Sequence, residues 1–413
     1  MKRRAALAWS LLGFILYIGL PYLLVQRLGL GLVRQGSWAK PEIALTFDDG
    51  PDPASTPAVL DALREVGASA TFFVLIPKAE SHPALIHRML SQGHQVELHA
   101  IKHRHAWLRS PWSALLEPSR GAARLERVTG LRLRFHRPPH GAYSLATLLG
   151  QRRAHLIGAH WNVEAHDWHP SSTPESVTAR VLADVHPGAV VVLHDAGPGA
   201  RTTVPALPGL LAELGRRGYS FSTLNDLSGA TPLTLARLPQ RFASLLDAAF
   251  DRLGGIGPVR GRKDSLFRAA RVAFPLSNVM FQNGVSLPKG TPAIEFHVNN
   301  PLIVGIGPRA SVRRALRHDL HELADDIHDR PNWQSAQAVF CLSSLSPLMT
   351  FAGFETVPLP AAHTRRLTAW GNVLRRLYGS PPQAPAAHLS VMQMEVFLGK
   401  FGFLAKSGEL AKK

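Results

Sequence analysis

Between residues 41 and 226, short apolar runs alternate with amphipathic stretches. Seven runs have the length and composition of buried strands: 43–47, 70–75, 95–98, 131–136, 156–163, 189–193 and 219–223. The stretches between them, such as 56–66, 83–92 and 116–129, have helical periodicity. Strands that alternate with helices form parallel sheets. We therefore expect an α/β fold, most simply an irregular seven-stranded (β/α) barrel.

The first of these strands runs directly into two adjacent carboxylates. Asp48 and Asp49 follow the apolar run, and Gly50 and Pro51 then break the strand. Adjacent carboxylates repel each other unless a cation or a reacting proton stabilises them. The carboxyl ends of strands are also where barrel and open α/β folds place their chemistry. A solvated Asx-type turn is the alternative at this point.

A histidine pair follows the third predicted strand. His99 and His103 are four residues apart, so on a helical turn they share one face, whereas His105 is out of phase with them. Two imidazoles and one carboxylate form a three-ligand zinc set with an open position for water. Such a pair is commonly surface histidine, but Asp48 and Asp49 at another strand end favour a metal site.

Polar side chains also follow three later strands. After the run 131–136, Arg137 is followed by two prolines, which form a rigid turn that can direct it at a carboxylate. Asp167 and Trp168 lie after the next run, and His194 ends a wholly apolar strand. A histidine at this position is an acid–base candidate. An arginine-capped turn and a structural loop histidine are the alternatives.

In order and spacing, these clusters closely resemble the motifs of the polysaccharide deacetylase family, the NodB-type carbohydrate esterases. The resemblance covers about residues 41–226. It is carried by Thr46-Phe47-Asp48-Asp49-Gly50, by His99-x3-His103, by Arg137-Pro138-Pro139-x-Gly141, by Asp167-Trp168 and by Leu193-His194.

The resemblance implies metal-dependent removal of an N-acetyl group from a glycan. Asp48 would be the general base, and Asp49, His99 and His103 would hold a divalent metal, zinc first and cobalt or manganese as alternatives. The metal would polarise the amide carbonyl and lower the pKa of the attacking water.

The remaining motif residues would complete the acid–base and substrate-binding groups. Arg137 would orient Asp48, and His194, paired with Asp167, would protonate the departing amine. The substrate would contact Pro139, His140, Gly141, Trp168 and Leu193.

Three positions depart from the family pattern. Ala100 stands where a serine or threonine is usual, His140 replaces an aromatic residue, and Glu164 replaces an aspartate. None of these changes removes a metal ligand or an acid–base group, so they bear on substrate identity more than on activity. Two other functions stay open: a non-catalytic carbohydrate-binding protein on the same fold, and a related hydrolase of a small cyclic amide.

The N-terminus carries a membrane signal. Lys2, Arg3 and Arg4 precede residues 5–26, which contain no charged side chain and are long enough to span a bilayer. The basic residues should hold the N-terminus in the cytoplasm. We expect residues 1–33 to be a cytoplasmic stub and single-pass anchor, with the catalytic domain outside the cytoplasmic membrane. A cleaved signal peptide, with 37–39 as a small-x-small site, is the rival, and a buried core helix is a weaker one.

The chain is strongly basic, with a formal net charge of +17 and a pI of about 10.8. This charge favours anionic surfaces such as phospholipid or acidic wall polymers. The arginines are scattered, so we expect no nucleic-acid module. Cys341 is the only cysteine, which excludes a disulfide within the chain.

The C-terminal half predicts a smaller α+β domain over residues 241–380, after a linker at 227–240 and before a tail at 381–413. Helices are expected at 241–254, 311–329 and 364–378, a hairpin at 293–305 and a strand at 336–342. It loosely resembles an uncharacterised domain attached to some deacetylases. His318, His321, Glu322 and Asp325 form a polar helix face, for which a solvated surface is favoured over a metal site.

Overall fold

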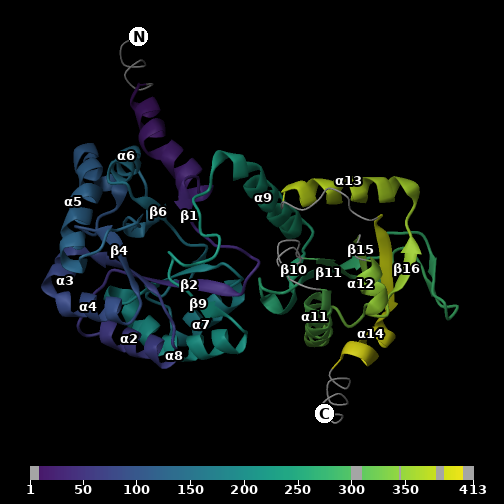
Figure 1. The fold of residues 1–413 in the computed structure, drawn as a ribbon. Coiled ribbons are helices and arrows are strands. Elements are labelled where there is room, and N and C mark those ends of the chain that lie inside the picture. Colours follow the sequence, from purple (N-terminus) through teal and green to yellow (C-terminus); the bar gives the residue numbers. More distant parts are fainter. Residues whose placement is uncertain (1–8, 299–308, 344–345, 378–385, 403–413) are drawn as a thin grey trace. The chain divides into compact units, whose positions relative to one another are not determined.

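The computed structural model describes residues 9–298, 309–343, 346–377 and 386–402 (Figure 1). The chain divides into two compact units, Met1–Leu238 and Pro239–Lys413.

The first unit is built on a parallel sheet. Its strand order is β1-β6-β5-β4-β3-β2-β8-β7, and β9 pairs with β2 at the end where β2 begins. The strands are β1 (Leu32–Val33), β2 (Glu42–Asp48), β3 (Thr71–Leu75), β4 (Gln95–Ala100), β5 (Phe135–His136), β6 (Ile157–Ala159), β7 (Val163–Glu164), β8 (Val190–His194) and β9 (Ser220–Phe221). This sheet, covered by helices, confirms the predicted α/β barrel fold.

Helices connect these strands: α2 (Thr56–Glu65), α3 (Ile76–Ser81), α4 (Pro83–Ser91), α5 (Pro111–Thr129), α6 (Leu145–Arg153), α7 (Pro174–Asp184) and α8 (Gly197–Arg216). Their first residues follow from local sequence. Ser110 and Thr173 accept hydrogen bonds from backbone amides in the first turns of α5 and α7, and a proline follows each cap. The helix predicted at 116–129 therefore begins five residues earlier, at Pro111.

Alternation along β2 separates two environments. Leu45 and Phe47 pack in the core between the sheet and its helices, whereas Ala44 packs with Phe73 and Val190 on the inner face. Asp48, two residues after Thr46, therefore also faces inward. The outer face of β2 is wholly apolar, and its inner face carries the carboxylate of Asp48 at the carboxyl end of the strand.

Three predicted strands differ in the structure. The run 156–163 forms two short strands, β6 and β7, because the chain leaves the sheet between them, where the amide of Asn162 bonds to the carbonyl of Val190. The run 131–136 pairs only at Phe135–His136, and 219–223 only at Ser220–Phe221. β1 was not predicted.

The boundary expected at residue 33 is wrong. The apolar helix Trp9–Arg27 is long and apolar enough to cross a membrane. Leu32 and Val33, which follow it, pair with β6 in the sheet of the first unit. Their side chains are buried, which explains why this end of the apolar segment joins the fold.

The predicted linker 227–240 is also partly wrong. Leu227 is buried with Leu224 in the inner core, and the amide of Leu233 donates to the carbonyl of Leu32. Residues 227–233 therefore pack as part of the first unit.

The second unit contains a mixed six-stranded sheet of order β10-β11-β14-β15-β17-β16 and a hairpin of β12 and β13. The strands are β10 (Gly257–Pro258), β11 (Phe267–Ala273), β12 (Val279–Met280), β13 (Ser286–Leu287), β14 (Pro292–Val298), β15 (Ala338–Ser343), β16 (Glu355–Pro358) and β17 (His388–Gln393). The helices are α9 (Leu238–Leu253), α11 (Arg309–Asp329), α12 (Ser346–Phe351), α13 (Ala361–Leu377) and α14 (Met394–Phe401). This is the α+β arrangement that the sequence predicts.

The tail expected at 381–413 is wrong for its described part. β17 lies between β15 and β16, and Leu389 and Val391 are buried in the core of the unit. Alternating apolar residues in this strand were the signal that the prediction missed. The second strand of the predicted hairpin, at 302–305, lies outside the described residues.

In the described part of the chain, polar residues of α11 make hydrogen bonds and ion pairs within the second unit. His321 is buried, and its Nδ1 lies 2.7 Å from the carbonyl oxygen of Phe401. Glu322 lies 3.8 Å from Arg260 and 3.9 Å from Arg262. Among the described residues, the candidate metal group lies in the first unit.

Candidate active site

Adjacent strands bring the first and last motifs together. Asp48 of β2 and His194 of β8 are register partners in a parallel pair, so their side chains leave the sheet on the same face. Leu193 pairs with Phe47 and lies with it in the core between the sheet and the helices. Alternation turns its side chain away from Asp48 and His194, which speaks against the predicted contact between Leu193 and substrate.

Asp48 is held by a buried arginine. Nη1 of Arg137 donates to Oδ1 of Asp48 at 2.8 Å and to Oγ1 of Thr46 at 2.7 Å, and Nη2 donates to the carbonyl of His160. The guanidinium, which is fully buried, also stacks 4.1 Å from the ring centre of Phe73. Because its other contacts and its packing fix the guanidinium, Arg137 holds Oδ1 of this carboxylate in one place. The sequence motif contains Thr46, but its contact with Arg137 was not predicted.

Asp49, His99 and His103 converge as the sequence predicts. Nε2 of His99 and Nε2 of His103 each lie 3.2 Å from Oδ1 of Asp49, and one ligand atom from each residue lies within 4.8 Å of the others. Two ligands bound about 2.0–2.1 Å from a tetrahedral zinc are themselves roughly 3.3 Å apart. Oδ1 of Asp49 and Nε2 of His99 are buried without a hydrogen-bond partner among the described residues. The three residues can therefore hold a metal ion.

The ionisation of this group suits a cation. Burial raises the pKa of Asp49, but the imidazoles of His99, His103 and His194 outweigh it and lower the pKa overall. Burial, with the neighbouring histidines, lowers the pKa of His103, although Asp49 opposes this shift. An ionised carboxylate and a neutral imidazole are the forms that bind metals.

A second buried acid, Asp195, supports the loop that carries Asp49. Oγ1 of Thr56 donates to Oδ2 of Asp195 at 2.5 Å, and Oγ of Ser55 donates to its carbonyl at 2.6 Å. Burial raises the pKa of Asp195 to about 7, against the opposing hydrogen bond from Thr56. The carboxyl group lies directly against Gly50, where only a residue without Cβ fits. No role was predicted for Asp195, although it directly follows His194.

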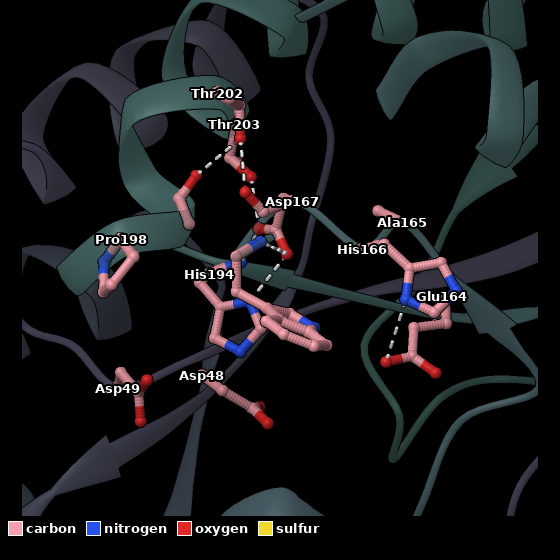
Figure 2. A network of polar contacts seen from close by, with 12 residues as sticks. Asp48, Asp49, Glu164, Ala165, His166, Asp167, His194, Pro198, Thr202 and Thr203 are labelled. Atoms are coloured by element: carbon pink, nitrogen blue, oxygen red, sulfur yellow. Dashed lines mark hydrogen bonds and ion pairs between the residues drawn. The ribbon is translucent and has the colours of Figure 1, made fainter. Parts of the chain in front are cut away.

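His194 is oriented by Asp167 (Figure 2). Nδ1 of His194 lies 2.8 Å from Oδ1 of Asp167, and the amide of His194 donates to Oδ2 at 2.8 Å. Thr203 of α8 donates to the same Oδ2 at 2.6 Å. The other ring nitrogen of His194 points toward the side where Asp48 and Asp49 lie. The sequence predicted the His194–Asp167 pair but not Thr203.

Opposing effects set the protonation of His194. Burial lowers its pKa, but the hydrogen bond and charge of Asp167, with the charges of Asp48 and Asp49, raise it to about 9. In this state the imidazolium can donate a proton from Nε2 while Asp167 accepts from Nδ1.

The other residues predicted to contact substrate differ in their exposure to solvent. His140 and Trp168 are exposed, and His140 contacts the ring of His103 at 4.8 Å between centres. Pro139 and Gly141 are buried, so they shape the turn and offer little side-chain surface. Gly141 has a φ of 58°, and a Cβ there would come 2.6 Å from Nε2 of His160.

The two further departures from the family pattern are Ala100 and Glu164. Ala100 is buried at the end of β4. Oε2 of Glu164 accepts from the indole of Trp161 at 3.3 Å, and its Oε1 lies 3.5 Å from Nδ1 of His166. Figure 2 shows Glu164 beside His166, with both separated from His194.

Comparison with known proteins identifies the class. Residues 35–157 match the polysaccharide deacetylase family, and residues 237–383 match the YkoP domain. A chitooligosaccharide deacetylase of Sinorhizobium fredii is 38% identical over 206 residues, which cover 46% of this chain and 93% of the relative. A peptidoglycan-N-acetylglucosamine deacetylase of Bacillus cereus is 35% identical over 187 residues, 45% of this chain and 87% of the relative.

A crystal structure of a peptidoglycan N-acetylglucosamine deacetylase is 28% identical and has a TM-score of 0.47, covering 51% of this chain and 97% of that one. The chain belongs to the polysaccharide deacetylase family. It carries a YkoP domain after the deacetylase domain.

Proposed function

We propose that this protein hydrolyses the N-acetyl amide of an N-acetylated sugar in a cell-surface glycan and releases acetate. Family membership supports the reaction, and the relatives named as chitooligosaccharide and peptidoglycan deacetylases support the substrate class. The observation that carries the proposal is the convergence of Asp49, His99 and His103 beside Asp48 and His194.

Zinc fits the three candidate ligands, because one carboxylate and two imidazoles are a donor set that catalytic zinc sites use. When bound, it would polarise the amide carbonyl and make the attacking water more acidic. Asp49, His99 and His103 would hold it. Cobalt and manganese accept the same donors, so the choice among them is part of the proposal.

Asp48 and His194 act as base and acid on the same face of the sheet. Asp48 takes a proton from the attacking water, and Arg137 keeps the accepting carboxylate in place. His194 then gives the proton on Nε2 to the departing amine nitrogen, while Asp167 holds the ring through Nδ1. His140 and Trp168, both exposed, contact the sugar.

The reaction takes place outside the cytoplasmic membrane, with the chain anchored by its N-terminal helix. The apolar helix Trp9–Arg27 and the basic residues before it support this placement. A signal sequence would have the same composition, so protein that pellets with membranes and begins at Met1 distinguishes an anchor from a cleaved leader.

Acetate release tests the function. The full-length protein in detergent would be stripped with a chelator, reloaded with zinc, cobalt or manganese, and assayed on chitin-like oligomers and peptidoglycan fragments. We expect acetate release only after reloading, highest with zinc. A folded, zinc-loaded protein that binds these glycans and releases no acetate would instead support the non-catalytic binding function.

A further inference from the structure

The N-terminal helix packs along the catalytic unit. Its turn Ile15–Gly19, in the middle of the apolar helix Trp9–Arg27, packs against α6 (Figure 1). Further along the helix, Val25 packs with Leu32 and Tyr143. A membrane that receives this helix must therefore also meet α6, because the two elements lie side by side.

The surface next to this helix exposes large apolar side chains. On α6, Leu145 is 40% exposed and Leu149 is 49% exposed, and nearby Leu108 and Trp112 are 82% and 71% exposed. These four residues form what we call the apolar patch. Such a group on a soluble surface marks an interaction site.

Two contacts place the parts of the apolar patch together. The indole of Trp107, beside Leu108, donates to the carbonyl of Tyr143, two residues before Leu145. The first turns of α5, where Trp112 lies, approach α6 so closely that a Cβ at Gly150 would meet the carbonyl carbon of Leu115 at 2.9 Å.

The chemistry around the apolar patch is that of a lipid interface. Tyr22 of the N-terminal helix contacts Trp107 edge-on at 5.7 Å, and aromatic side chains of this kind gather at the headgroup level of membranes. Arg152 and Arg153 are exposed in the last turn of α6. Their long side chains can reach anionic headgroups while the leucines of the same helix enter the acyl boundary.

The apolar patch is close to the candidate metal site. Ring contacts run from Tyr22 to Trp107, from Trp107 to His105 at 4.8 Å, from His105 to His140 at 5.3 Å, and from His140 to His103 at 4.8 Å. A candidate metal ligand is thus connected to the apolar N-terminal helix through three intervening side chains. A membrane around this helix would therefore lie near a sugar bound at the candidate metal site.

We propose that the apolar patch contacts the membrane that holds the N-terminal helix, and that the natural substrate is an N-acetylated sugar attached to a membrane lipid. The inference rests on the proposed deacetylase function and on the proposed membrane anchor. A lipid-attached sugar is presented at the level of the site and shares the surface with the enzyme, which raises its effective concentration.

The position of the apolar patch can be measured without catalysis. Leu149→Cys and Leu131→Cys, each in the Cys341→Ser background, would carry a polarity-sensitive dye in vesicles of phosphatidylethanolamine and phosphatidylglycerol. Leu131 is exposed but follows the far end of α5, so it is the matched control. We expect a blue-shifted emission, quenched by brominated lipid, at position 149 only. Equal emission and quenching at the two positions would overturn the proposal.

The substrate is tested in the same vesicles. Acetate release from N-acetylglucosamine on a long-chain lipid would be compared with release from a soluble N-acetylglucosamine oligosaccharide, for wild type, Leu108→Asp/Leu149→Asp and Leu131→Asp. We expect wild type to prefer the lipid-attached sugar, and the ratio of the two rates to fall at least fivefold in the double variant only.

The outcomes are separable. A wild-type preference for the soluble sugar, or an unchanged ratio in the folded double variant, overturns the lipid-attached substrate and leaves the deacetylase function standing. No acetate from either sugar with zinc-loaded wild type overturns the deacetylase function, while the dye still decides where the apolar patch lies. If the double variant fails to fold, the dye emission of the labelled proteins still tests the position of the apolar patch, and the preference of wild type between the two sugars still tests the substrate.

Discussion

The carboxyl group of Asp195 lies against the backbone of Gly50, so closely that a Cβ at Gly50 would come 2.6 Å from Cγ of Asp195. Gly50 follows Asp49, whose φ of 76° is already unusual for a residue with a side chain. Lys78 adds a further contact by donating to the carbonyl of Asp49 at 2.9 Å. The backbone that presents the candidate metal ligand is therefore held from several sides.

We predict that Gly50→Ala lowers the free energy of unfolding by about 1–3 kcal/mol, because the added methyl overlaps Asp195. In Gly50→Ala/Asp195→Ser the overlap is relieved, so the double variant should be less destabilised than the sum of the singles. Urea unfolding measures both. Gly209→Ala is the control, since a Cβ there meets nothing within 4 Å. Additive effects would show that Gly50 and Asp195 do not interact.

Removing one candidate metal ligand should cause a selective loss of zinc. His99→Ala should lose tightly held zinc, because two remaining donors are a poor set for this ion. His105→Ala should keep it, since His105 is outside the group formed by Asp49, His99 and His103. Metal content after gel filtration measures the difference. Equal zinc content in the two folded variants would exclude the assignment of His99.

The pH dependence of kcat/KM should identify the acid. His194 must be protonated, and its pKa, raised to about 9 in the protein alone, keeps it protonated above the ordinary value of ~6.5. A bound cation repels the imidazolium, so the alkaline limb of the loaded enzyme should lie between these values. Asp167→Asn removes the raising charge and should move this limb down, with little change in the acidic limb.

Glu164→Gln is the control for that experiment. Glu164 contacts Trp161 and His166, so its neutralisation should leave the alkaline limb in place. An alkaline limb that stays fixed in zinc-loaded Asp167→Asn would rule out His194 and Asp167 as a coupled acid.

Leu193 and Trp168 should separate stability from substrate binding. Leu193→Ala should lower the free energy of unfolding by about 2–5 kcal/mol, because its side chain fills the core, while KM stays close to that of wild type. Trp168→Ala, at an exposed position, should raise KM with little loss of stability. Steady-state kinetics and thermal unfolding distinguish the two variants. A large rise in KM for Leu193→Ala would show that Leu193 contacts the substrate.

The sequence predicted the parts of this protein that local pattern determines. Asp48, Asp49 and His194 could be placed because each directly ends an apolar strand, and strand ends of a parallel sheet lie at one edge. The motif could not show which way Leu193 faces, because it lists residues that are adjacent along the chain, whereas the pleat of a strand turns adjacent side chains to opposite faces. Thr203 and Asp195 act through contacts that span long sequence separations, and no local pattern indicates them.

Short or isolated strands were harder to predict for the same reason. β1 has two residues and follows an apolar helix, so its pairing with β6 depends on tertiary contacts alone. β17 follows a Pro/Ala-rich stretch, and its place between β15 and β16 depends on strands far earlier in the chain.

The central claim is that Asp48 is the base and is distinct from the metal ligands. The most direct measurement is zinc content and acetate release, side by side, for wild type, Asp48→Asn and Asp52→Asn, the last being an acid of the same loop whose Oδ1 accepts from the amide of Ala54. We predict that Asp48→Asn keeps its zinc and loses turnover by about 10²–10⁴-fold, and that Asp52→Asn keeps both. Loss of zinc from folded Asp48→Asn, or turnover close to that of wild type, would contradict the account.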